Sequence, residues 1–116
     1  MKGVWGEHTA RAYLERAGYR TVETNFRTRF GEIDIIAERG EYIVFVEVKT
    51  RKSDRFAAAR EYVTSEKQRR IIATAELWLR QHPTALQPRF DVVEVYGGEG
   101  TTSVPRINHL ENAFGG

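Results

Sequence analysis

The sequence predicts an α/β fold in which a mixed β-sheet is flanked by helices. Two segments carry apolar residues at helical spacing. They alternate with shorter runs rich in Val, Ile, Phe and Tyr, in the order helix, three strands, helix, strand, strand. The run at 42–50 is apolar on both faces over most of its length, which is typical of a central strand covered on both sides. Because 41% of its 116 residues are hydrophobic, the chain can bury a core, and residues 1–116 are expected to form one domain.

The first half of the chain is expected to form one helix followed by three strands. Residues 3–17 form the helix, because Ala10 and Leu14 lie on one apolar stripe at helical spacing and Gly18 follows as a C-terminal stop. The polar stretch 38–41 suits a hairpin turn between the last two strands. The three strands are expected at residues 19–26, 32–37 and 42–50.

The second half begins with an irregular stretch, 53–63, which is expected to form a short helical turn or a flap. Ser65 followed by Gln68 resembles a capping box, so a helix should begin there and end near Pro83. The remaining elements are expected in this order: a strand at 89–96, a turn at 97–102, an edge strand at 104–107, and a short tail at 108–114 for which a helix is one alternative.

The third strand breaks its own burial pattern at its C-terminal end. Both faces are apolar until Glu47 and Lys49, which enter on one face only. A hairpin brings these two side chains close to Asp34, near the end of the neighbouring strand. A strand that is apolar on both faces and then carries charged residues on one face only is typical of a functional site.

Two carboxylates and an ammonium at this spacing are the groups needed to hold a divalent metal and cut a phosphodiester. Asp34, Glu47 and the backbone carbonyl of Val48 offer the hard oxygen ligands that Mg²⁺ or Mn²⁺ prefers. Lys49 could orient or deprotonate the attacking water and stabilise the charge that develops on phosphorus. Glu7 would close the site from the first helix, since extending the apolar stripe backward places Glu7 on it.

Each of these residues also has a simpler interpretation. A Glu-x-Lys pair in a strand is more often a surface ion pair. Glu7 could equally lie in the exposed first turn, where the helix dipole favours an acid. Glu32 shares strand parity with Asp34, and a structural role is the favoured interpretation for it.

Basic residues gather around the predicted site although the formal net charge is only +2. Clustering alone is more often a solvated surface, but beside two carboxylates it suits a polyanion such as DNA. The candidate nucleic-acid contacts are Arg27, Arg29, Arg51, Lys67, Gln68, Arg69 and Arg70.

The sequence lacks the residues and motifs on which several other kinds of functional site depend. The chain has no cysteine, which excludes disulfides, thiolate catalysis and Cys-ligated zinc. It has no Gly-rich phosphate loop, no Gly-x-Ser-x-Gly and no His-Glu-x-x-His, and its three histidines are scattered without metal spacing. The N-terminus lacks the apolar core of a signal peptide and no apolar stretch is long enough for a bilayer, so a cytoplasmic location without membrane partners is expected.

Several motifs in combination resemble the YraN family of small bacterial proteins over nearly the whole chain. That family is similar to Holliday-junction resolvases within the PD-(D/E)xK restriction-endonuclease-like superfamily. The resemblance implies a three-layer core, a central motif of Asp34, Glu47 and Lys49, and Glu7 as the helix-borne acid, with Ile33 where the superfamily name has proline. The motifs are Gly31-Glu32-Ile33-Asp34, Phe45-Val46-Glu47-Val48-Lys49-Thr50-Arg51, Lys67-Gln68-Arg69-Arg70, Arg89-Phe90-Asp91-Val92-Val93 and Ile107-Asn108-His109-Leu110-Glu111-Asn112-Ala113-Phe114.

The leading hypothesis from the sequence is a nuclease that uses Mg²⁺ or Mn²⁺ on DNA, including branched or structured DNA. One alternative is a nucleic-acid-binding module that keeps the nuclease fold but cleaves little or not at all. Another is a partner-binding protein whose carboxylates only stabilise strand ends. Junction cleavage calls for two symmetric sites, so a homodimer is expected by analogy.

Overall fold

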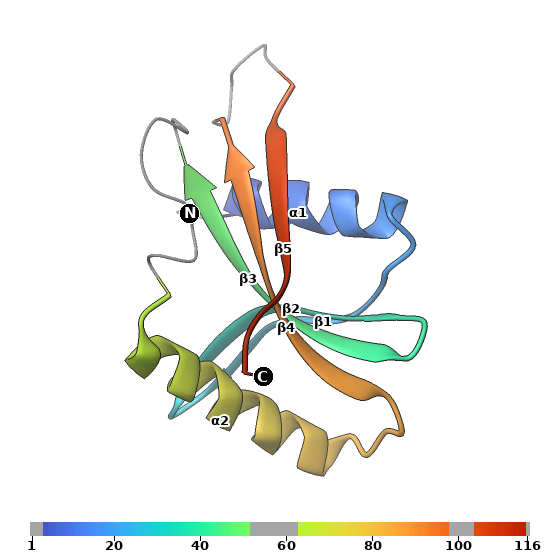
Figure 1. Ribbon diagram of the computed structural model, residues 1–116, viewed down its shortest axis with the longest axis vertical. Coiled ribbons are helices and arrows are strands. Elements are labelled where there is room, and N and C mark those ends of the chain that lie inside the picture. Colours follow the sequence, from blue (N-terminus) through green and yellow to red (C-terminus); the bar gives the residue numbers. More distant parts are fainter. Residues whose placement is uncertain (1–3, 52–62, 98–103, 116) are drawn as a thin grey trace.

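The computed structural model describes residues 4–51, 63–97 and 104–115, which form one five-stranded sheet and two helices (Figure 1). This α/β fold confirms the predicted class and is compatible with a restriction-endonuclease-like core. No helix in these residues is long and apolar enough to cross a bilayer. The elements are α1 (Val4–Arg16), β1 (Arg20–Thr28), β2 (Gly31–Arg39), β3 (Tyr42–Arg51), α2 (Ser65–Gln81), β4 (Gln87–Tyr96) and β5 (Arg106–Phe114).

The sheet is mixed, and its strands follow the order β1-β2-β3-β4-β5. β3 and β4 run parallel, joined by a connection that contains α2, while every other neighbouring pair is antiparallel. β3 is therefore the central strand, as its two apolar faces predicted. The candidate residues of β2 and β3 lie beside the end of this ladder, because the last antiparallel pair between the two strands is Ile35 with Val46.

A helix covers each face of the sheet, so the molecule has three layers (Figure 1). On one face, Ile43 and Phe45 of β3 pack in a cluster with Trp78 of α2. On the other, Val44 and Val46 pack with Leu14 of α1. The alternation of side chains along β3 thus supplies both cores. Glu47 and Lys49, near its C-terminal end, lie outside both apolar clusters.

The helix ends confirm one prediction and correct another. Gly18 follows α1 with a φ of 95°, a left-handed conformation that glycine adopts without strain, and so provides the predicted stop. The N-cap of α2 is Thr64 and not Ser65: the Thr64 hydroxyl accepts a hydrogen bond from the Lys67 backbone amide at 3.1 Å. The N-cap was predicted one residue too late, because Thr64 and Ser65 are both good caps and local sequence does not choose between them.

The C-terminal segment corrects the helical alternative for the tail. Residues 108–114 continue the predicted edge strand, and β5 pairs with β4 from Tyr96 to Phe90. The Phe114 ring stacks on the Phe90 ring with centroids 5.3 Å apart. The pairing and this aromatic contact are long-range interactions, which outweigh the weak local helix preference of a short segment. The segments predicted as a flap (53–63) and as a turn (97–102) lie, apart from Val63 and Gly97, outside the described residues.

Candidate active site

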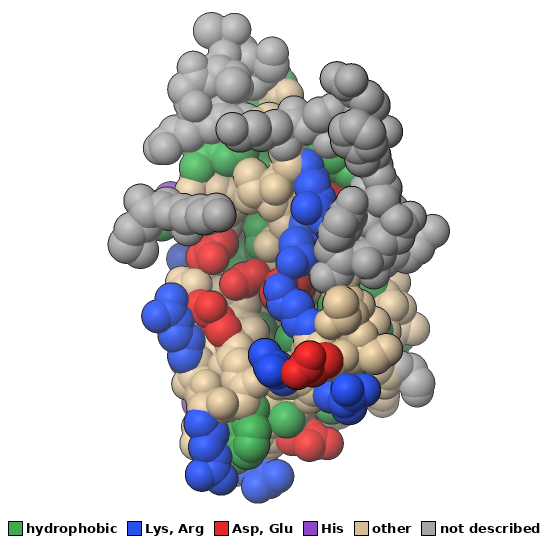
Figure 2. All heavy atoms as spheres, turned by 90° about the vertical axis from the view of Figure 1, so that its left-hand side faces the viewer, with side chains coloured by type: hydrophobic (Ala, Val, Ile, Leu, Met, Phe, Trp, Pro, Cys, Tyr) green, Lys and Arg blue, Asp and Glu red, His purple; other side chains and the backbone are tan. Residues whose placement is uncertain are grey.

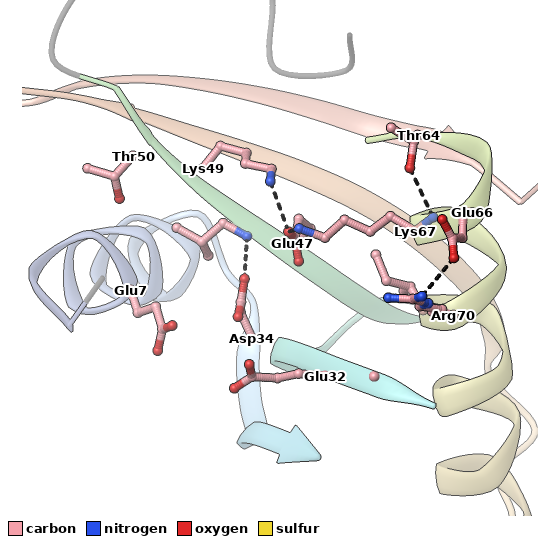
Figure 3. Close-up of a pocket in the computed structure, with 13 residues that line it drawn as sticks. Glu7, Glu32, Asp34, Glu47, Lys49, Thr50, Thr64, Glu66, Lys67 and Arg70 are labelled. Atoms are coloured by element: carbon pink, nitrogen blue, oxygen red, sulfur yellow. Dashed lines mark hydrogen bonds and ion pairs between the residues drawn. The ribbon is translucent and has the colours of Figure 1, made fainter. Parts of the chain in front are cut away.

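A pocket of about 660 Å³ lies between the two helices, at the point where β2 and β3 diverge (Figure 3). It contains all four residues that the sequence nominated for catalysis. The residues that line it are Glu7 of α1, Gly31, Glu32 and Asp34 of β2, Glu47, Val48, Lys49 and Thr50 of β3, and Thr64, Glu66, Lys67, Arg70 and Ile71 at the start of α2.

Asp34 is positioned by the end of the strand ladder. Beyond the pair Ile35 and Val46, the Asp34 side chain accepts the hydrogen bond of the Val48 backbone amide at 2.8 Å. A carboxylate here takes the place of a backbone acceptor, which satisfies the amide while the strands separate. The same contact fixes the direction of the carboxylate, which a catalytic or metal-binding role requires.

Glu47 is the most enclosed acid of the pocket, with 7% of the residue exposed. Its Oε2 lies 3.4 Å from Lys49 Nζ and 2.5 Å from Lys67 Nζ. Lys49 comes from the same face of β3, as the strand period predicted, whereas Lys67 reaches in from the first turn of α2 (Figure 3). The sequence nominated Lys67 as a nucleic-acid contact and did not pair it with Glu47. Its pairing with Glu47 depends on how α2 docks, which no local pattern reveals.

The charges in the pocket perturb one another. Burial, reinforced by the negative charge of Glu47, raises the pKa of Asp34 to about 8. Burial also lowers the pKa of Lys49, and the neighbouring Lys67 lowers it further. Burial alone would lower the pKa of Lys67, but the Glu47 carboxylate raises it above its ordinary value. Lys67 is therefore the more firmly protonated of the two ammonium groups.

Glu7 lies in the first turn of α1, as one interpretation of the sequence had it, but it is half-buried rather than exposed and it lines the pocket. Its Oε1 accepts a hydrogen bond from Asn25 Nδ2 at 2.9 Å. The preceding Gly6 allows α1 to approach β3 closely, because a Cβ at that position would lie 2.1 Å from Thr50 Oγ1. Glycine at position 6 thus brings the acid at position 7 to the site.

The donor set fits a hard divalent cation. Asp34 and Glu47 lie close enough for each negative charge to disfavour the other, and a cation between them would relieve that repulsion. Within the described residues, no three His, Cys, Asp or Glu side chains are arranged to hold a metal ion together. Two carboxylates are nevertheless the set that Mg²⁺ commonly uses, since it keeps several waters and takes other oxygens from substrate.

The structure brings some of the predicted nucleic-acid contacts to the pocket and leaves others away from it. Lys67 and Arg70 line it, and Arg70 Nη2 also lies 2.7 Å from Glu66 Oε1. Arg27 stands beside it, paired with the pocket acid Glu32 at 2.9 Å. Figure 2 shows the result on this face: acidic side chains gather together, with Lys and Arg side chains around them.

Besides Arg27, four predicted contacts do not line the pocket, namely Arg29, Arg51, Gln68 and Arg69. The Gln68 amide donates to the Val63 carbonyl at 2.9 Å and so belongs to the start of α2. Arg69 is exposed, and Arg51 is half-buried at the end of β3. Arg29 lies in the β1–β2 turn, where its guanidinium covers the Phe30 ring at 5.0 Å from the centroid.

Replacing Asp34 with asparagine is expected to stabilise the metal-free protein at pH 8. The folded-state pKa of about 8 exceeds the ordinary value of 3.8, so the contribution of this carboxyl to stability is greatest below pH 4 and falls as the pH rises toward 8. The asparagine side chain would be neutral throughout and could still accept the Val48 amide. Thermal unfolding followed by circular dichroism in EDTA, at pH 4.5, 6 and 8, measures this difference.

The midpoint of Asp34→Asn should exceed that of the wild type by several degrees at pH 8, and the two should converge near pH 4.5. Glu38→Gln is the control, since Glu38 lies on the same strand but outside the pocket. A variant that is less stable than the wild type at every pH would contradict the charge repulsion described above.

Comparison with known proteins identifies relatives that cover almost the whole chain. The sequence profile of "Uncharacterised protein family UPF0102" matches residues 6–95. A "UPF0102 protein" of Syntrophomonas wolfei is 43% identical over 97% of this chain and 96% of its own length. Similar proteins occur in Vibrio parahaemolyticus (45% identical, 93% of this chain and 87% of the relative) and Geobacter metallireducens (46%, with 97% and 90%). These names state no activity, so function has to be inferred from the pocket itself.

Proposed function

The chain belongs to uncharacterised protein family UPF0102, and from this starting point we propose that it is a nuclease that hydrolyses DNA phosphodiester bonds with Mg²⁺ or Mn²⁺. The observation that carries the proposal is the meeting of Asp34, Glu47 and Lys49 in one pocket, closed by Glu7 from α1. Acids from two neighbouring strands, with a lysine beside them, form the constellation expected for metal-assisted phosphodiester hydrolysis.

Each residue has a role that its position supports. Asp34 and Glu47 would hold the cation, with the Val48 backbone carbonyl as a third oxygen. When bound, the cation supplies an activated water and a Lewis acid for the phosphoryl oxygen. Lys49 orients the attacking water and stabilises the charge that develops on phosphorus, and its lowered pKa suits it to accept a proton. Glu7 positions water or a further ligand from the opposite wall.

Lys67 completes the acid-base arrangement. Its ammonium pairs with Glu47 and remains charged, so Lys49 can lose its proton without leaving Glu47 uncompensated. Lys67 and Arg70 line the pocket, so they are placed to contact the phosphates of a polyanion that enters it.

DNA as substrate, including branched or structured DNA, and a cytoplasmic location belong to this proposal. The support is the basic surface around the pocket and the family resemblance of its motifs. Cleavage of a four-way junction needs two symmetric cuts, so the proposal includes a homodimer for that substrate.

The test is cleavage by the purified protein of single-stranded, duplex and four-way-junction DNA. Labelled substrates are incubated with Mg²⁺, Mn²⁺ or EDTA and resolved on denaturing gels. We expect products with Mn²⁺ or Mg²⁺ and none in EDTA. Retention of all three substrates uncut with either metal, by a protein that is folded and binds DNA, would contradict the nuclease assignment.

One observation favours a second function, a nucleic-acid-binding module without cleavage. Lys49 and Lys67 already neutralise Glu47 within the protein, so the pocket has an internal alternative to a cation. Such a module would bind DNA with a steep salt dependence, and EDTA would not alter its affinity. The cleavage gels and a salt titration of binding together separate the two functions.

A further inference from the structure

The turn between β1 and β2 presents an aromatic side chain to solvent. β1 ends at Thr28 and β2 begins at Gly31, which leaves Arg29 and Phe30 at the tip. Phe30 is 40% exposed, and Val104 is the only other large hydrophobic residue that is exposed in the described part of the chain. A single exposed hydrophobic residue needs no explanation by itself. The residues around Phe30, however, indicate a role for its exposed ring.

The turn is fixed in place beside α2. The Thr28 hydroxyl accepts a hydrogen bond from the Phe30 amide at 3.1 Å and lies 3.3 Å from the Thr74 hydroxyl of α2. Gly31 lies against α2, where a Cβ would meet Arg70 Cβ and Thr74 Oγ1 at 3.4 Å, in van der Waals contact. An aromatic ring on a rigid turn loses little conformational freedom when it binds a ligand.

The turn also adjoins the pocket. Gly31, directly after Phe30, lines the pocket, and so does Arg70, which Gly31 contacts. A phosphate-containing polymer that places one phosphate beside Asp34 and Glu47 can therefore pass over the turn as it leaves the pocket.

The charge around Phe30 indicates which kind of polymer would pass over the turn. Three guanidinium groups stand beside or near the turn, on Arg27, Arg29 and Arg70. The side chains of Arg27 and Arg70 are 72% and 62% exposed, and Arg29 has no carboxylate partner among the described residues. Exposed arginines around a partly exposed aromatic ring, with the Arg29 guanidinium lying over that ring, match a strand that offers phosphates and flat bases together.

We propose that Phe30 is a stacking platform for an unpaired base of the substrate, so that the pocket acts on nucleic acid with a single-stranded segment. This inference rests on the proposed function of the pocket, and it narrows the substrate class. Bases within a duplex hide their faces in the stack, whereas a single strand, a flap or a branch point offers them to an aromatic side chain.

The test is DNA affinity in EDTA, so that binding is measured without cleavage. Fluorescence anisotropy compares a labelled dT20 strand with a duplex of equal length, for the wild type, Phe30→Ala and Phe30→Trp. We expect Phe30→Ala to weaken dT20 binding about tenfold and duplex binding less than about twofold, because stacking contributes only to the single strand. Phe30→Trp should restore dT20 affinity, and its added indole fluorescence should be quenched by dT20. Val104→Ala removes the second large hydrophobic side chain that is exposed among the described residues, and it should change neither affinity.

The outcomes separate this inference from the nuclease proposal. If Phe30→Ala binds dT20 as well as the wild type does, or loses equal affinity for dT20 and duplex, base stacking on Phe30 is overturned, whatever the gels show. If the variants behave as expected but no DNA is cut with Mn²⁺, stacking stands and the nuclease assignment fails.

Discussion

Glu47→Gln is expected to reduce Mn²⁺-dependent DNA cleavage on the order of 10³-fold in kcat/KM, or ~4 kcal/mol of transition-state stabilisation. The substitution keeps the shape of the side chain and removes its charge. The pocket then loses one of its two cation-holding carboxylates, and Lys49 and Lys67 lose the anion they share. Both consequences act on the reacting groups, so the loss should appear in cleavage and not in folding. Single-turnover cleavage of a labelled strand measures it.

Two measurements separate catalysis from structure in this variant. DNA binding in EDTA should be retained or slightly tightened, because one negative charge near the phosphates is gone. Its far-UV circular dichroism should match that of the wild type. Glu76→Gln makes the same change on the exposed surface of α2 and should cleave normally. If Glu47→Gln cleaves DNA at the wild-type rate, the reaction takes place somewhere other than this pocket.

Asp91→Asn is expected to destabilise the protein by ~3–5 kcal/mol, which corresponds to a fall of more than about 10 °C in Tm. Asp91 is fully buried (0% exposed) on β4, away from the pocket. Its carboxylate accepts two hydrogen bonds from Arg89 at 2.9 and 2.8 Å, one from His109 Nε2 at 2.7 Å and one from the Asn112 backbone amide at 2.9 Å. Asparagine would leave the guanidinium without a buried counter-charge and cannot accept all four bonds.

The Asp91 network joins three elements, which is why its loss should unfold the protein as a whole. His109 and Asn112 belong to β5, and His109 Nδ1 lies 2.9 Å from the hydroxyl of Tyr13 on α1. The His109 ring thus lies between the Asp91 carboxylate at Nε2 and the Tyr13 hydroxyl at Nδ1. The edge strand and α1 are thus tied to the buried carboxylate.

The effect of Asp91→Asn should depend on pH. Burial by itself raises the pKa of Asp91, but the hydrogen bonds from His109, Arg89 and Asn112 outweigh it and leave the pKa below its ordinary value of 3.8. A carboxyl with a depressed folded-state pKa contributes stability that is present above pH 4 and is lost as the pH falls through that lower value. The gap between wild type and variant should therefore shrink below pH 4, measured by urea unfolding.

Glu111→Gln is the control for this experiment. Glu111 Oε1 lies 3.8 Å from the Arg89 guanidinium but is 56% exposed, so its removal should cost at most about 1 kcal/mol. If Asp91→Asn is no less stable than Glu111→Gln, the buried network is not what holds β5 and α1 to the sheet.

The central part of the fold could be predicted because its signals are local and agree with one another. The helical stripe with Ala10 and Leu14, the stop at Gly18 and the two-faced apolar run of β3 each combine a period with a termination signal. β5 lacked such agreement. Only pairing with β4 and the Phe114–Phe90 contact make residues 108–114 a strand, and neither is visible in the segment itself.

The candidate site divides in the same way. Asp34, Glu47 and Lys49 were predictable because they lie on consecutive strands whose alternation fixes their faces. The role of Lys67 was not predictable, although its ammonium lies closer to the Glu47 carboxylate than that of Lys49 does. A helix can rotate and tilt on a sheet, and only packing decides which residue it turns inward.

By itself, the sequence determined which chemical groups the chain can bring to one end of its sheet, since a two-residue period and a short turn leave little choice of face. The tertiary structure alone decided which of those groups meet across helices. It set two lysines on one acid, placed Phe30 on a fixed turn at the rim, and joined Asp91 to His109 and Tyr13. The physical reason is that local backbone geometry is encoded within a few residues, whereas the docking of α1, α2 and β5 is decided by the free energy of burying the whole core at once.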